Sequence, residues 1–146
     1  NTNKFDFVSL SGRNKILKSN KTTIYDETYN ASPESVKACI NNLLDSPNNH
    51  FLILGSMQEL GSKSKKYHKD LFDFINRSDI KKCIFICDKN DAIYYADYLK
   101  KSHKFIFFND LSKVSKTINK YTNPGDFILI KGSRFWQLER IIKSID

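Results

Sequence analysis

Three short polar segments hold the residue types that bind ligands or move protons. They are DETYNASP (26–33), GSMQELG (55–61) and KGSR (131–134). Each one directly follows a short apolar run, which indicates a loop after a buried strand. Carboxylate, amide and hydroxyl groups in such loops can hydrogen-bond the sugar or phosphate of a ligand, and lysine or arginine can bind an anion.

The first segment has more hydrogen-bonding capacity than a turn needs. Ser32 is suited to be a helix N-cap, Pro33 to be the first helical residue, and Glu34 to lie in the first turn. Capping does not account for the polar residues at 26–30. We therefore expect those residues to face a ligand rather than only to close a turn.

The third segment can form an anion site, because Lys131, Ser133 and Arg134 stand between a buried strand and the start of a helix. The alternative is a plain helix cap, with Ser133 as the N-cap and Arg134 in solvent. We expect the charged side chains at this strand exit to be exposed. Arginine is scarce in the chain, which suggests that the retained ones are needed for their planar, forked donors. The four are Arg13, Arg77, Arg134 and Arg140.

The second segment is bracketed by Gly55 and Gly61, which suggests tight turns or a close approach of the backbone. His68 follows within the next expected helix. A single histidine at such a place can be catalytic, but we interpret it as structural.

The cysteines and histidines predict neither a disulfide nor a metal site. Cys83 and Cys87 lie about 13 Å apart on one expected strand, too far to be bridged. With Cys39 they are interpreted as small buried hydrophobes in a reducing cytoplasm. The three histidines show no spacing with them that is typical of zinc ligands.

Strands and helices alternate along the chain around these segments. Continuous apolar runs, typical of parallel strands covered on both faces, occur at 24–25, 51–54, 83–87, 105–108 and 127–130. Apolar residues with helical spacing recur between and after them, and we expect these stripes to be core. The stripes are Val36, Cys39, Ile40, Leu43 and Leu44; Tyr67, Leu71, Phe74 and Ile75; Leu111, Val114, Ile118 and Tyr121; and Phe135, Leu138, Ile142 and Ile145.

This alternation predicts an α/β fold, a Rossmann-like open and mainly parallel sheet of about six strands with helices on both faces. The runs FDFVSL (5–10) and NKIL (14–17) are expected to add an edge strand or a hairpin. Ligands of such sheets bind at the carboxyl ends of the strands, which is where all three polar segments fall.

Length and composition are those of one globular domain. The chain has 146 residues, of which 40% are hydrophobic and 27% charged. The net charge of +8 raises the possibility of nucleic-acid binding, but the lysines are spread along the chain. Their densest run, KSKKYHK (63–69), is interpreted as the solvated face of a helix. No apolar run approaches the length of a membrane span, so no membrane partner is expected.

Three common motifs are missing from the sequence. No G-x-G-x-x-G follows the first expected strand, no G-x-x-x-x-G-K-[ST] occurs, and no G-x-S-x-G elbow occurs. The chain is therefore neither a self-sufficient dinucleotide binder nor a P-loop ATPase, and nothing supports a serine hydrolase.

Taken in order, four motifs resemble the carboxy-terminal domain of the Mur ligase family, nearest to its MurF branch. They are Gly12-Arg13, DETYNASP (26–33), LGSMQELG (54–61) with His68, and PGDFILIKGSR (124–134). The resemblance covers nearly the whole chain. It implies that residues 12–146 are this domain and that residues 1–11 are a remnant of the connection to a preceding central domain.

The resemblance implies an ATP-dependent peptide ligase of peptidoglycan synthesis. Ligases of this branch use ATP and Mg²⁺ to activate UDP-N-acetylmuramoyl-tripeptide, whose acyl phosphate is attacked by the amine of D-alanyl-D-alanine. The phosphate loop and magnesium ligands belong to the central domain, so the chain alone is expected to be inactive. The whole protein is expected to be a cytoplasmic monomer.

The resemblance also implies roles for particular residues. Nucleotide contacts would come from Arg13, Glu27, Tyr29 and Asn30, and substrate contacts from Lys131, Ser133 and Arg134. No catalytic residue and no metal ligand is expected in this domain alone. The chain departs from the family pattern at Glu27, Ser32 and Ser56, where aspartate, asparagine and aspartate are usual.

Two other functions stay open at this point. One is a basic, non-enzymatic α/β module that binds nucleic acid or an acidic partner, for which the Tyr29-Asn30 loop would have no role. The other is an amide ligase of the same superfamily that uses ATP but a different amine.

Overall fold

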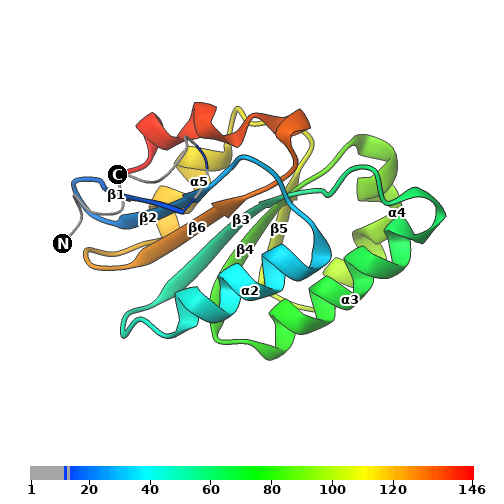
Figure 1. Cartoon of the computed structure of the whole chain (residues 1–146), viewed down its shortest axis with the longest axis horizontal. Coiled ribbons are helices and arrows are strands. Elements are labelled where there is room, and N and C mark those ends of the chain that lie inside the picture. The colour runs from blue at the N-terminus through cyan, green and yellow to red at the C-terminus, as the bar shows by residue number, and fades with distance from the viewer. Residues whose placement is uncertain (1–11, 13) are drawn as a thin grey trace.

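Six strands form a single sheet in the order β1-β2-β6-β3-β4-β5 (Figure 1). The computed structural model describes residue 12 and residues 14–146. The strands are β1 (Lys15–Lys18), β2 (Thr23–Glu27), β3 (His50–Gly55), β4 (Ile80–Ile86), β5 (Phe105–Phe108) and β6 (Phe127–Lys131). β1 runs antiparallel to β2, and every other neighbouring pair is parallel. The predicted open, mainly parallel sheet of about six strands is confirmed.

The start of the chain contributes an edge strand, as expected. β1 falls on the run NKIL and pairs with β2 in a register that places Ile16 opposite Tyr25. The other early run, FDFVSL (5–10), lies outside the described residues.

Helices cover both faces of the sheet (Figure 1). The α-helices are α2 (Pro33–Leu44), α3 (Ser64–Arg77), α4 (Lys89–Leu99) and α5 (Val114–Tyr121), and the 3-10 turns are η1 (Gly61–Lys63), η2 (Arg134–Trp136) and η3 (Leu138–Ser144). α2, α3 and α4 pack on one face, whereas α5 and η3 pack on the other.

The core therefore has two layers that meet at the sheet, and β3 contributes to both. Leu52 and Leu54 pack with the residues of α2, α3 and α4, while Phe51 and Ile53 pack with α5 and η3. All six residues of β3 are buried, which explains why its sequence is continuously apolar rather than alternating.

The last apolar stripe does not form an α-helix, and one of its residues is not core. Gln137 has a left-handed backbone with φ of 49°, which separates η2 from η3. Leu138 and Ile145 are buried as expected. Phe135 lies on the other side of this break and is 71% exposed, so the expectation that it belongs to the core is wrong.

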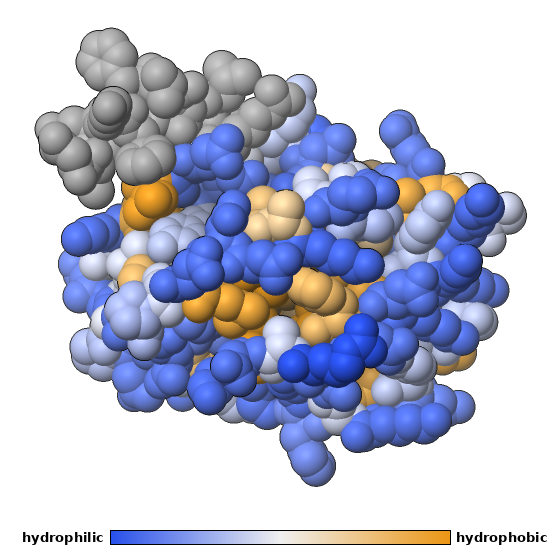
Figure 2. All heavy atoms as spheres, turned by 60° about the horizontal axis from the view of Figure 1, so that its bottom comes forward, coloured by the Kyte–Doolittle hydropathy of each residue, from blue (hydrophilic) through white to orange (hydrophobic). Residues whose placement is uncertain are grey.

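Hydrophilic side chains cover most of the face formed by α2 and α3, and hydrophobic ones gather in a strip across its middle (Figure 2). Lys65 and Lys66 of the run KSKKYHK are exposed on α3, whereas Leu71 and Ile75 of the same helix are buried. The lysines of the run thus lie on the solvated face of an amphipathic helix, as interpreted from the sequence, whereas His68 within the run is buried.

The cysteine thiols lie in or against the core. Burial raises the pKa of Cys39 and of Cys83 and raises the pKa of Cys87 to about 12, so these thiols stay protonated. Within the described part of the chain, no group of three or more His, Cys, Asp or Glu side chains could hold a metal ion. None of the described helices has the length and apolar character that a membrane crossing requires.

Candidate functional site

The loops after β2, β3 and β6 meet at one edge of the sheet. β6 lies between the other two strands, and its last residue, Lys131, is paired in register with both Glu27 of β2 and Leu54 of β3. Because all three strands are parallel, their carboxyl ends bring the three polar segments together. The segments of the sequence that looked most capable of chemistry therefore form one continuous edge.

Lys131 is the centre of this edge, and it is buried. Its ammonium group donates to the carbonyl oxygen of Asn30 at 2.9 Å and lies 3.7 Å from the Glu27 carboxylate. The Lys131 side chain is 5% exposed and that of Glu27 is 15% exposed. The expectation of exposed charges at this strand exit is therefore wrong for Lys131, whose long side chain crosses to the neighbouring loop.

Two residues of the β2–α2 crossing are structural. The Asp26 carboxylate accepts hydrogen bonds from the backbone N–H of Thr28 at 3.1 Å and from its hydroxyl at 2.7 Å. Both residues are buried, and this local turn fixes the path of the chain as it leaves the strand. Their polar groups are thus already satisfied by each other.

The helix cap at the end of the crossing is formed as expected. The Ser32 hydroxyl accepts from the Ser35 backbone N–H at 3.2 Å, and the Ser35 hydroxyl accepts from the Ser32 N–H at 2.9 Å. This reciprocal pair is a capping box, and Pro33 is the first helical residue.

Tyr29 and Asn30 are the exposed residues of the crossing. They line a hollow of about 250 Å³ together with Lys131 and the first turn of α2. Tyr29 is 41% exposed, and the side-chain oxygen of Asn30 accepts from the next backbone N–H at 2.9 Å. Two residues expected to touch nucleotide and one expected to touch substrate thus border the same small hollow.

Arg13 lies outside the described residues, but its neighbours lie against the same crossing. The Tyr29 N–H donates to the carbonyl of Gly12 at 2.8 Å, and the Asn14 N–H donates to Glu27 at 2.6 Å. Gly12 has φ of 80°, and a Cβ there would lie 2.9 Å from the Tyr29 nitrogen. Position 12 therefore needs glycine.

Ser133 and Arg134 differ in how their polar groups are used. The Arg134 guanidinium donates to the carbonyl of Thr28 at 3.4 Å and pairs with the carboxylate of Glu139. The Ser133 hydroxyl is buried, does not cap η2, and makes no hydrogen bond within the described part of the chain. A plain cap formed by Ser133 with Arg134 in solvent is therefore not what the structure has.

Trp136 is a residue of this edge that the sequence reasoning missed. A Cβ on Gly55 would lie 2.7 Å from its ring and 3.4 Å from Gly132, so the two strand exits approach closely and the indole covers Gly55. The indole N–H donates to the hydroxyl of Ser56 at 3.0 Å. Its position in the sequence could have indicated a place at this edge, because the chain's only tryptophan stands two residues after KGSR.

His68 holds the second loop in place. Its Nε2 accepts from the backbone N–H of Met57 at 3.0 Å, and its Nδ1 donates to the carbonyl of Ser64 at 2.8 Å. Nε2 can accept this bond only in the neutral ring, and burial lowers the pKa of His68. The residue is 2% exposed, which agrees with the structural role expected from the sequence.

Comparison with known proteins decides the family. Residues 12–134 match the family model described as Mur ligase, glutamate ligase domain. This chain belongs to the Mur ligase family. The predicted resemblance is confirmed.

Curated relatives named UDP-N-acetylmuramoyl-tripeptide–D-alanyl-D-alanine ligase match most of this chain. The relative from Rickettsia prowazekii is 31% identical over 94% of the chain, and the one from Borreliella burgdorferi is 34% identical over 90%. The chain spans 30% and 28% of these relatives' own lengths.

Solved structures agree. The MurF ligase from Thermotoga maritima, crystallised in complex with ADP, is 31% identical to this chain with a TM-score of 0.79. The match covers 93% of this chain and 30% of that one. MurF from Acinetobacter baumannii has a TM-score of 0.80 at 23% identity, which supports the fold.

Proposed function

We propose that this chain is the carboxy-terminal domain of an ATP-dependent ligase that joins D-alanyl-D-alanine to UDP-N-acetylmuramoyl-tripeptide in peptidoglycan synthesis. The observation that carries the proposal is the edge where Glu27 and Lys131 pair. It brings the Tyr29-Asn30 loop and the Ser133-Arg134 loop together in a chain that belongs to the Mur ligase family. The printed names of the relatives support this choice of substrates.

The β2 side of the edge is proposed to contact the nucleotide. Glu27 can accept a hydrogen bond from a ribose hydroxyl, and Tyr29 and Asn30 border the hollow beside it. Arg13 is proposed as a further nucleotide contact. The hollow holds about 250 Å³, less than the 300 Å³ or more typical of a complete small-ligand site, so this domain would supply part of the nucleotide's contacts.

Mg²⁺ does not fit the described residues of this edge. The Glu27 carboxylate is engaged by the Lys131 ammonium group and by the Asn14 N–H, which leaves it poorly placed as a metal ligand. We therefore assign the metal, like the phosphate loop, to the central domain of the same protein. No step of the reaction is assigned to a metal held by this chain.

The β6 side is proposed to contact the incoming dipeptide. Ser133 offers a buried hydroxyl without a partner among the described residues, and such a group is costly unless a ligand or water satisfies it. Lys131 and Arg134 act partly through the backbone, because they hold the carbonyls of Asn30 and Thr28. They would set the spacing between the nucleotide and dipeptide sides.

In this reaction the tripeptide carboxylate is first phosphorylated, and the dipeptide amine then attacks the acyl carbon and displaces phosphate. This chain's part is to bind, orient and exclude water. We propose that the whole protein works as a cytoplasmic monomer and requires neither nucleic acid nor a membrane.

The test is amine-dependent release of phosphate by the full-length protein supplied with ATP and UDP-N-acetylmuramoyl-tripeptide. Turnover should require D-alanyl-D-alanine and should be far slower with single amino acids. Equal or better turnover with a different amine would identify another amide ligase of the family. Absence of turnover with every amine would contradict the proposal.

A further inference from the structure

Glu139 is a charged residue beside the strand-exit edge to which the proposed function gives no role. It is the second residue of η3, and one of its carboxylate oxygens accepts a hydrogen bond from the Arg134 guanidinium. Its other carboxylate oxygen is buried and has no partner within the described part of the chain. Among the described residues, Arg134 is thus the polar partner that this carboxylate has.

The pairing of Glu139 with Arg134 depends on the break in the chain at Gln137. Residues five positions apart in an unbroken α-helix point about 140° away from each other, because each residue turns the helix by about 100°. The left-handed backbone of Gln137 separates η2 from η3 and interrupts that spacing. The break therefore lets the Glu139 side chain reach Arg134.

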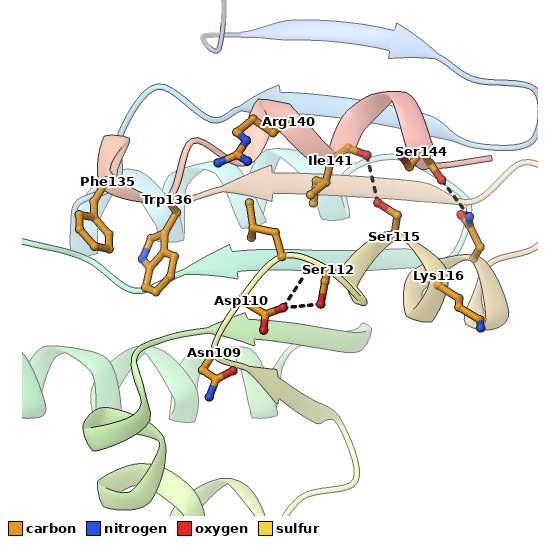
Figure 3. A pocket seen from close by; sticks show the side chains of 12 residues that line it. Asn109, Asp110, Ser112, Ser115, Lys116, Phe135, Trp136, Arg140, Ile141 and Ser144 are labelled. Atoms are coloured by element: carbon orange, nitrogen blue, oxygen red, sulfur yellow. Dashed lines mark hydrogen bonds between the residues drawn. The ribbon is translucent and has the colours of Figure 1, made fainter.

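η3 is a firm support for Glu139, because it is fastened to α5. The Ser115 hydroxyl donates to the carbonyl of Ile141 at 3.1 Å. The Asn119 amide donates to the carbonyl of Ser144 at 3.1 Å. Figure 3 shows these two bonds crossing from α5 to η3. The carboxylate that holds Arg134 is therefore carried by an anchored segment and not by a free loop.

The Arg134 guanidinium joins two parts of the molecule. One nitrogen donates to the carbonyl of Thr28 in the β2–α2 crossing at 3.4 Å, and another donates to Glu139. A guanidinium has five N–H donors in one plane, so donors remain for a ligand. The Arg134 side chain is 45% exposed, and the remaining donors are accessible from solvent.

Two anchors fix the plane in which those remaining donors lie. A long arginine side chain without anchors samples many rotamers and loses that freedom when a ligand binds. Glu139 and the Thr28 carbonyl restrict Arg134 before any ligand arrives. Removal of the Glu139 charge should therefore weaken ligands that bind Arg134 and leave other ligands unaffected.

Arg140 gives a contrast within the same 3-10 turn. It directly follows Glu139, but it lines a separate hollow of about 850 Å³ beside α5 (Figure 3). Its guanidinium makes no ion pair with any of the residues that the structure describes. Two neighbouring charged residues thus serve different surfaces, and Arg140 is a natural control for changes at Glu139.

We propose that Glu139 is a positioning residue of the ligase reaction, which holds the Arg134 guanidinium in the orientation that contacts the dipeptide. The proposal rests on the proposed function, which assigns the dipeptide to the β6 side of the edge. Glu139 acts through Arg134 and needs no contact with the reacting atoms.

The test is a double-mutant cycle in the full-length protein, with Glu139→Gln, Arg134→Ala and the two changes together. The Michaelis constants for D-alanyl-D-alanine and for ATP are measured in each variant. Glu139→Gln keeps the size of the side chain but removes its charge. It should raise the constant for the dipeptide about two- to fivefold, as for a lost half-exposed ion pair, and leave that for ATP unchanged. In the Arg134→Ala background it should have no further effect.

Two further variants separate positioning from a general effect on the fold. Arg140→Gln removes a charge one position along the same turn and should leave both Michaelis constants unchanged. Glu139→Asp restores the carboxylate on a shorter side chain and should recover part of the affinity for the dipeptide. A structural role of Glu139 would instead lower the melting temperature and change the constants for both substrates together.

Four results for Glu139→Gln would overturn the inference. They are an unchanged Michaelis constant for the dipeptide, an equal rise for dipeptide and ATP, the same rise in the Arg134→Ala background, and a lowered constant for the dipeptide. The last result would mean that Glu139 competes with the ligand for Arg134. If the unaltered full-length protein turns over D-alanyl-D-alanine in these cases, the proposed function stands and only the role of Glu139 is wrong. Absence of turnover with every amine contradicts the proposed function itself.

Discussion

At the scale of single residues, the pairing of Lys131 with Glu27 connects segments that are 104 positions apart in the chain. The sequence predicted that both residues belong to a site, because each follows a buried strand. It did not predict the burial of Lys131, since burial follows from a strand register that only the folded sheet defines. A charged residue at a strand exit is usually exposed, and here the neighbouring loop covers it.

Lys131→Ala is expected to destabilise the domain. Removing one partner of a buried ion pair leaves the other carboxylate poorly compensated, at a cost of about 3 kcal/mol. Urea unfolding of the chain should show a lower midpoint for Lys131→Ala, and the exposed Lys101→Ala should serve as a control without effect. A midpoint like that of the unaltered chain would show that Glu27 and Lys131 are solvated independently.

His68 predicts a dependence of stability on pH. Burial lowers its pKa in the folded state, whereas the unfolded ring keeps a pKa of about 6.5. The unfolded state therefore binds the extra proton first, so the stability is fully present above pH 6.5 and falls as the pH drops below it.

The measurement is the free energy of unfolding at pH 7.5 and at pH 5.5, for the unaltered chain and for His68→Gln. The unaltered chain should lose more stability between these pH values than the variant. His50, whose pKa burial also lowers, contributes equally to both proteins and cancels. An equal loss in the two proteins would mean that His68 is not held neutral by the loop.

At the scale of elements, the strands and most helices could be predicted from the sequence. The short, continuous apolar run of β3 is typical of a strand covered on both faces, and the apolar stripe of α3 is typical of an amphipathic helix. The stretch after β6 could not be predicted in the same way. Its apolar spacing is helical, but Gln137 adopts a left-handed backbone and divides it into two 3-10 turns. Phe135, on the far side of that break from η3, is exposed.

The contact of Gly55 with Trp136 predicts a large effect from one methyl group. In Gly55→Ala the new Cβ would start 2.7 Å from the indole, so Trp136 must move and the exit of β6 with it. Overpacking of this kind costs about 1 to 3 kcal/mol. Ser56→Ala removes the indole hydrogen bond without adding atoms and should cost about 1 kcal/mol.

Both effects can be followed through the fluorescence of Trp136, the chain's only tryptophan. Gly55→Ala should shift its emission to longer wavelength and lower the unfolding midpoint more than Ser56→Ala does. Identical spectra for Gly55→Ala and the unaltered chain would show that the indole does not cover Gly55.

At the scale of the whole molecule, this chain is about three-tenths of the length of its relatives. The described edge offers contacts to ligands, but the sequence holds no phosphate loop to bind ATP on its own. The isolated chain should therefore show no ATP hydrolysis and at most weak nucleotide binding. A coupled assay for ADP, with the full-length protein as the positive control, checks this, and turnover by the purified chain would reject it.

The central claim is that one edge of this domain serves two ligands, with the nucleotide on the β2 side and the dipeptide on the β6 side. Steady-state kinetics of the full-length protein test it most directly, with ATP and D-alanyl-D-alanine varied in turn. Glu27→Gln and Arg134→Ala are the variants. Lys131 is left unaltered, since its truncation would remove the bond to the Asn30 carbonyl as well as the ion pair, whereas Glu27→Gln keeps a side-chain oxygen that can accept from Lys131.

Arg134→Ala should raise the Michaelis constant for the dipeptide roughly ten- to 150-fold, as expected for a lost charge-assisted hydrogen bond of about 1.5 to 3 kcal/mol, and should change that for ATP less. Glu27→Gln should do the reverse and raise the Michaelis constant for ATP more than that for the dipeptide. The division of this edge between the two ligands would be contradicted if each variant changed the Michaelis constants for ATP and for the dipeptide by the same factor. It would also be contradicted if neither variant changed either constant.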